Sequence, residues 1–157
     1  MKTLVLSILV ALMALVVPVT AGVTQNEKIP YDMIVWVPCA NDGAGEDVEL
    51  SGMLHILVTY TEDGAGGRHY KMHYQSQGIT GVGTVTGDKY QATGVTQDNV
   101  YIAPDDGYPY VHTYINNFRI IGQGPGNNLQ VHDTYHITID ANGEVTAEVV
   151  NSEVDCN

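Results

Sequence analysis

The chain has 157 residues, with six Lys or Arg against 18 Asp or Glu, so its formal net charge is −12 at pH 7. This length is that of one ordinary domain. The negative charge argues against nucleic acids and anionic membrane surfaces as partners, because both would repel an acidic protein. Neutral and cationic ligands are the classes that fit this charge.

Residues 1–21 have the pattern of a signal peptide. Lys2 supplies the positive start, an apolar run follows from Leu4 to Val17, and Ala21 is the small residue that a signal peptidase prefers. The run is shorter than the roughly 18 to 20 residues of a membrane-spanning helix. We therefore predict that residues 1–21 are removed, that residues 22–157 form the mature domain, and that the protein is secreted, either to a periplasm or out of the cell.

The mature chain has two cysteines, Cys39 near its start and Cys156 one residue from its end. In an exported protein the expected state of such a pair is a disulfide. Closing so long a loop would stabilise the fold by about 4 to 5 kcal/mol in the chain-entropy account. Neither cysteine lies in a redox or catalytic motif, which argues against a reactive thiol.

Apolar and polar residues alternate through most of the mature chain, as in half-buried strands. The clearest cases are 48–61 and 68–75, separated by an acidic, glycine-rich turn. Strands are expected at 33–37, 48–61, 68–75, 89–96, 110–121, 129–139 and 144–150. Such strands with glycine turns are typical of an all-β domain. We predict a single antiparallel β-barrel of meandering hairpins, because closure removes sheet edges, with a barrel-like sandwich as the alternative.

Alternation also limits how the strands pair. Residues paired between 48–61 and 68–75 must have numbers with an even sum of about 128 to 130, because a slip of one residue would turn a face over. His55 then lies opposite His73 or next to it. In the last hairpin, a turn centred on Asn142 would place His136 opposite Glu148.

One segment resembles a known group of proteins. The run NNFRIIGQGPGNN at 116–128, with Val131-His132 and the segment 140–145, resembles a group of small exported bacterial all-β proteins. The similarity extends from about Pro38 to Cys156. The resemblance implies export and a single β domain, and it transfers no activity and no catalytic residue.

Histidines are the first candidate site residues. His69 and His73 share one face of a strand, and His132 and His136 share a face of another, because residues four apart on a strand point the same way. His55 joins the first pair through the hairpin. Imidazoles suit zinc, copper, iron or nickel. The predicted metal ligands are His55, His69, His73, His132 and His136. The alternative is polar strand surface, since the spacing matches no ligand motif.

Tyrosines are the second candidate, with ten against one Phe and one Trp. Buried phenols need hydrogen-bond partners, so a tyrosine-lined interior is typical of a cleft that holds a small amphipathic or sugar-like ligand. The alternative is core packing with the hydroxyls at the rim. Arg119 is placed either to clamp an anionic group or to pair with an acid on the outer face. The predicted ligand-binding residues are Tyr60, Tyr70, Tyr74, Tyr114, Tyr135 and Arg119.

Three functions follow from these patterns. We expect first a binding or surface-interaction module with a tyrosine-lined interior. The second is a barrel enzyme, either metal-dependent or cofactor-free, that uses strand histidines as acids or bases. The third is a self-associating surface protein, which requires exposed sheet edges. No motif specifies a cofactor, and no pattern supports a serine or cysteine nucleophile.

Overall fold

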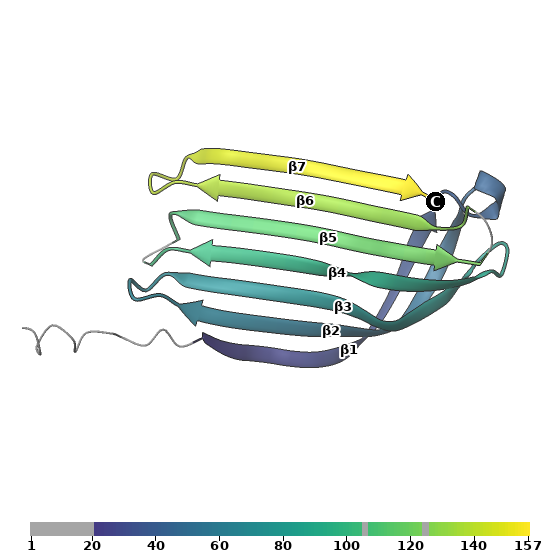
Figure 1. Cartoon of the computed structure of the whole chain (residues 1–157), viewed down its shortest axis with the longest axis horizontal. Helices are drawn as coiled ribbons and strands as arrows, with labels where there is room; N and C mark the ends of the chain where they lie inside the picture. Colours follow the sequence, from purple (N-terminus) through teal and green to yellow (C-terminus); the bar gives the residue numbers. More distant parts are fainter. Residues whose placement is uncertain (1–20, 105–106, 124–125) are drawn as a thin grey trace, which may run out of the picture.

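The computed structural model describes residues 21–104, 107–123 and 126–157. The described chain forms one antiparallel sheet whose seven strands lie in sequence order, β1 to β7 (Figure 1). The elements are β1 (Ala21–Val37), η2 (Asn41–Gly43), β2 (Glu46–Glu62), β3 (Arg68–Gly83), β4 (Lys89–Ile102), β5 (Tyr110–Gly122), β6 (Leu129–Ile139) and β7 (Val145–Cys156). The prediction of an all-β meander is therefore confirmed. The predicted signal peptide lies outside the described residues, except for Ala21, with which β1 begins.

Most strand positions agree with the alternation in the sequence, and the differences are extensions. β1 begins at Ala21 rather than Met33, and β3 continues through its glycine-rich part to Gly83. Backbone ladders with neighbouring strands hold these weak strand formers in place, because pairing outweighs intrinsic preference. None of the described helical turns is long and apolar enough to cross a membrane.

The predicted barrel closure is not found, and neither is a two-sheet sandwich. β1 pairs only with β2 and β7 only with β6, so the single sheet has two free edges in the described chain. The two edges approach at one end, where the disulfide joins Cys39 to Cys156 with a Cα–Cα distance of 5.6 Å. The predicted disulfide is confirmed. It links the ends of β1 and β7 without a backbone ladder between them.

The sheet is curled at this end and extended at the other. In Figure 1 the far halves of β1 and β2 rise steeply across the end of the sheet where β6 begins and β7 stops. A β-bulge in β3 between Gln75 and Ile79 marks the bend, and Gly78 supplies the positive φ of 63° that it needs. Bulges increase local twist, so the curl follows from a local sequence feature.

The hydrophobic core fills the curled end. Its fully buried members come from six strands and from the loop after β1, namely Val37, Ala40, Val48, Leu50, Ile79, Tyr90, Ala92, Ile120 and Leu129. In the extended half, β2 has no fully buried side chain between Gly52 and Glu62, and every residue of β7 is exposed. The extended half is therefore a single layer. We call the face that continues from the core the inner face, and the opposite one the outer face.

A buried carboxylate closes the core at the turn between β3 and β4. Glu46 is only 1% exposed. It accepts hydrogen bonds from the backbone N–H groups of Val85 and Thr86 at 3.0 Å, from the Thr86 hydroxyl at 2.8 Å and from the Tyr90 hydroxyl at 3.0 Å. Burial raises the pKa of Glu46, but these hydrogen bonds outweigh it and leave the pKa below its usual value.

Candidate functional site on the inner face

The five predicted tyrosines lie on the inner face. Register places Tyr60 opposite Tyr70, and Tyr114 opposite Tyr135. The Tyr60 and Tyr70 ring centroids are 5.2 Å apart, and the Tyr60 hydroxyl donates to Glu62 at 2.8 Å. Tyr74 lies on the same face, four residues further along β3 than Tyr70. The structure thus brings the tyrosines onto one surface, where they are half-buried rather than enclosed in a lumen.

A hollow of about 480 Å³ opens on the inner face at the foot of the curl. Tyr31 of β1, Tyr74 of β3 and Tyr114 of β5 line it together with apolar and polar neighbours. Because β1 curls over the sheet, Tyr31 meets residues of β4 and β5 that are far from it in strand order. The volume lies within the usual range of small-molecule sites, roughly 300–1,000 Å³.

A chain of hydrogen bonds begins at Thr96 and Asn116, which line this hollow, and continues across the inner face to β7. The Thr96 hydroxyl donates to the Asn116 carbonyl oxygen at 2.9 Å, and the Asn116 amide donates to Asp133 at 3.0 Å. Ser152 of β7 donates to the other oxygen of Asp133 at 2.6 Å. These groups fix one another's orientation, which gives the hollow a pre-organised polar side.

Next to this chain lies a histidine–carboxylate pair. The Nε2 atom of His112 is 2.6 Å from an Asp98 oxygen, and the two side chains are 24% and 21% exposed. The His112 ring packs edge-on against Tyr135 at a centroid distance of 5.6 Å, and Tyr110 lies at 6.3 Å. The site therefore combines flat aromatic surface, an oriented imidazole and a carboxylate.

The local environment keeps the phenols protonated. Burial raises the pKa of Tyr114, and the carboxylates of Asp133 and Asp98 raise it further. Burial and then Asp98 raise the pKa of Tyr110 in the same way. Both phenols thus keep their protons well above neutral pH and are available as hydrogen-bond donors.

The predicted histidine ligands do not come together. His55, His69 and His73 lie on the outer face of β2 and β3, whereas His132 and His136 lie on the outer face of β6. Three strand spacings separate the two groups, roughly 14 Å at about 4.8 Å per strand. No group of three or more His, Cys, Asp or Glu residues able to hold a metal ion occurs in the described chain.

Their individual contacts are those of strand surface. His55 is hydrogen-bonded to Asn26 at 2.8 Å, and His136 to the Thr113 and Thr138 hydroxyls at 2.8 and 3.1 Å. His132 is hydrogen-bonded to Asn117, and His69 packs on Tyr101 with ring centroids 4.7 Å apart.

The strand registers confirm the predicted neighbour of His55 and show that the predicted partner of His136 was wrong. In the β2–β3 hairpin the paired numbers do have an even sum, with Tyr60 opposite Tyr70, and His55 lies opposite Gln75, diagonally next to His73. In the last hairpin, His136 lies opposite Val149 rather than Glu148. A bulge next to Ile139 inserts one residue into β7 and shifts the register.

Arg119 is not part of the tyrosine surface. It lies on the outer face, where its guanidinium donates to Gln130 at 3.0 Å. It lines a separate hollow there with residues of β6. Of the six predicted ligand-binding residues, the structure therefore groups the five tyrosines and places the arginine on the opposite side of the sheet.

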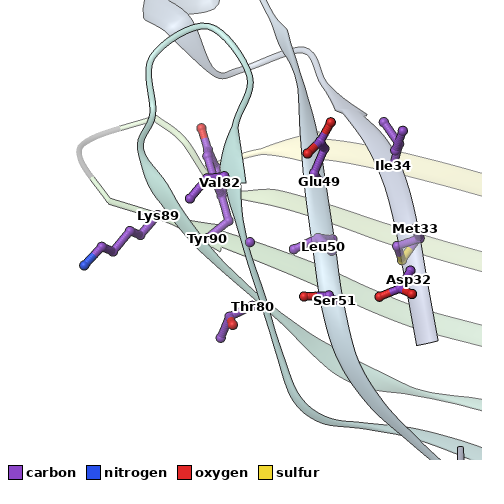
Figure 2. A pocket seen from close by; sticks show the side chains of 11 residues that line it. Asp32, Met33, Ile34, Glu49, Leu50, Ser51, Thr80, Val82, Lys89 and Tyr90 are labelled. Atoms are coloured by element: carbon purple, nitrogen blue, oxygen red, sulfur yellow. The ribbon is translucent and has the colours of Figure 1, made fainter. Parts of the chain in front are cut away.

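A larger hollow lies on the outside of the curled end (Figure 2). Its volume is about 940 Å³, and exposed side chains such as Asp32, Glu49 and Thr80 line it. In Figure 2 the Lys89 amino group extends away from the two carboxylates. Because these groups are solvated and not held by one another, we regard the inner-face hollow as the better candidate site.

Sequence reasoning missed the polar members of the site, namely Tyr31, Thr96, Asp98, His112, Asn116, Asp133 and Ser152. A usable signal was present for His112, because it alternates with Tyr110 and Tyr114 and so shares their face. Tyr31 carried no such signal, since only the curl of β1 brings it to the site.

Comparison with protein-family models, with curated proteins and with solved structures finds no match for this chain. The resemblance to small exported bacterial β proteins therefore stays a prediction from the sequence. The fold and the site define an acidic, disulfide-linked, open β-sheet protein with a tyrosine-rich inner face.

Proposed function

We propose that the protein is an exported binding module whose inner face takes a small, uncharged, hydroxyl-bearing ligand of sugar-like chemistry. The observation that carries the proposal is the hollow between Tyr31, Tyr74 and Tyr114, which has the oriented Thr96–Asn116 pair beside it. The Cys39–Cys156 disulfide is compatible with an oxidising, extracellular setting.

The chemistry of the hollow supports this ligand class in two ways. Tyrosine rings offer flat apolar surface for the C–H face of a sugar ring, and their hydroxyls offer donors at the edges. Asn116 and Asp98 supply further hydrogen-bonding groups at fixed positions. Asp98 lines the hollow, and Asp133 lies behind it as the hydrogen-bond partner of Asn116. No Lys or Arg is among the residues that line the hollow, so these carboxylates disfavour an anionic ligand.

The test is isothermal titration of the mature, oxidised protein with soluble oligomers of glucose, in both β-1,4 and α-1,4 linkage, and of N-acetylglucosamine. We expect at least one oligomer to bind and Tyr114→Ala to weaken it roughly tenfold, as loss of a stacked ring costs about 0.5–1.5 kcal/mol plus its buried area. Tyr114→Phe keeps the ring, so it should lose only the hydroxyl contribution.

The matched control is Tyr101→Ala, because Tyr101 lies on the outer face against His69. It removes an equal side chain from the same sheet and should leave ligand affinity unchanged. Binding that Tyr101→Ala and Tyr114→Ala weaken equally would place the ligand elsewhere. Absence of heat with every oligomer would reject the sugar-like class.

A further inference from the structure

The edge of the sheet formed by β7 is unusually open. β7 pairs with β6 on one side, and no strand of the described chain lies on its other side. All of its residues are exposed. Four of them are valines, Val145, Val149, Val150 and Val154, with 51% to 71% of their surface accessible. An edge strand of this length presents a row of unpaired backbone groups and is a template for another strand.

The opposite edge of the sheet, formed by β1, has features that prevent pairing with a further strand. β1 has a bulge between Val23 and Gln25, and it carries Lys28 and Pro30 on the edge. Bulges, lysine and proline are the usual devices against edge pairing. β7 has no Pro, Lys or Gly. Its one bulge lies at its start, before Ala147, and its register with β6 is unbroken from Ala147 to Cys156.

We propose that β7 pairs antiparallel with β7 of a second copy of this chain, which joins two sheets into one continuous sheet. If both inner faces are to lie on the same side, residues opposite one another must have the same parity. The register centred on the unbroken part of the strand sets Val150 opposite itself and pairs Ala147 with Glu153. It leaves out Cys156, which is tied to Cys39.

Charge placement fits this self-pairing. In the register centred on Val150, Glu148 lies opposite Ser152 and Glu153 lies opposite Ala147. Asp155 extends toward Val145 and Thr146, which lie at the β7 bulge and carry no carboxylate. No carboxylate therefore faces another directly across the interface, although β7 is acidic. The net charge of −12 per chain still opposes association at long range, so salt that screens this repulsion should strengthen the dimer.

The dimer should be weak, since edge pairing alone buries less than the roughly 1,200 Å² of a standard interface. The experiment is sedimentation equilibrium of the mature, oxidised protein from about 1 to 500 µM, at low salt and at about 0.5 M NaCl, where charge repulsion is screened. We expect a monomer–dimer equilibrium that shifts toward dimer at high salt.

Val150→Lys places two like charges opposite each other and should abolish dimerisation. Mixing Val150→Lys with Val150→Glu should restore it as a heterodimer. Val85→Lys is the matched control, because Val85 is 69% exposed in the β3–β4 turn and Val150 is 71% exposed. It adds the same charge away from the edge and should dimerise as the wild type does.

Three results would overturn the proposal. The first is a wild-type monomer at every concentration and salt. The second is a dimer or larger assembly that Val150→Lys leaves intact, which would place the interface elsewhere. The third is a tighter dimer in Val150→Lys, because it would mean that Val150 lies opposite Glu148 in a different register.

Discussion

At the residue scale, the most constrained polar group is Glu46. Its carboxylate takes four hydrogen bonds from Val85, Thr86 and Tyr90 in an apolar end of the molecule. A buried carboxylate left without these donors would be strongly destabilising. The turn between β3 and β4 is therefore folded around one side chain that precedes it by some forty residues.

We predict that Glu46→Gln lowers the free energy of unfolding by about 1.5–3 kcal/mol at pH 7, because it replaces charge-assisted hydrogen bonds and turns an amide toward backbone donors. The folded pKa of Glu46 is depressed. The stabilisation is thus present above its unfolded pKa and is lost as the pH falls through the folded value.

Chemical denaturation at pH 7 and at several values below the ordinary glutamate pKa of about 4.3 measures this. The gap between wild type and Glu46→Gln should narrow toward acid pH. A gap that stays constant with pH would show that the charge of Glu46 does not contribute.

At the element scale, β2 and β3 approach each other closely within the curled end. Gly81 lies opposite Leu50, and a Cβ on Gly81 would overlap the backbone carbonyl of Glu49 and lie 2.9 Å from Leu50 Cα. Backbone atoms cannot rotate away as a flexible side chain does, so only glycine fits there. The curl in turn places Tyr31 over β5 and so forms the hollow.

We predict that Gly81→Ala destabilises the fold by about 1–3 kcal/mol or more, the range of overpacked sites. Gly64→Ala is the control, because a Cβ on Gly64 meets nothing within 4 Å. Thermal unfolding followed by circular dichroism compares the two variants. Equal melting temperatures would mean that β2 and β3 can move apart at Gly81 without loss of stability.

At the scale of the whole molecule, the disulfide has a role that a closed barrel would not require. No ladder joins β1 to β7 in the described chain, so Cys39–Cys156 is a covalent link between the two edges across 117 positions of sequence. Such a link stabilises by restricting the unfolded chain, and more so for long loops.

We predict that the double variant Cys39→Ser, Cys156→Ser loses about 4 kcal/mol of unfolding free energy relative to the oxidised wild type. Reduced wild type should match the variant, because both lack the cross-link. Urea denaturation of the three samples is the measurement. Coincident unfolding curves for the oxidised protein and the variant would show that the disulfide does not contribute to the stability of the fold.

The amino-acid pattern was sufficient to predict the centres of the strands, the common face of the five predicted tyrosines, the parity of the β2–β3 hairpin and the cysteine pair. These follow from a period of two and from short turns, which are local properties. Only the tertiary structure decided that the sheet stays open, that His112 meets Asp98, that Tyr31 reaches the hollow and that the predicted histidine ligands stay apart. The open sheet, the position of Tyr31 and the separation of the histidines depend on bulges or on the arrangement of strands that do not follow one another in the chain, and the His112–Asp98 contact depends on the exact β4–β5 register. A bulge reverses which side chains face inward and bends the strand at one residue. The alternation of residues along one strand does not predict which residues of other strands the bend brings close.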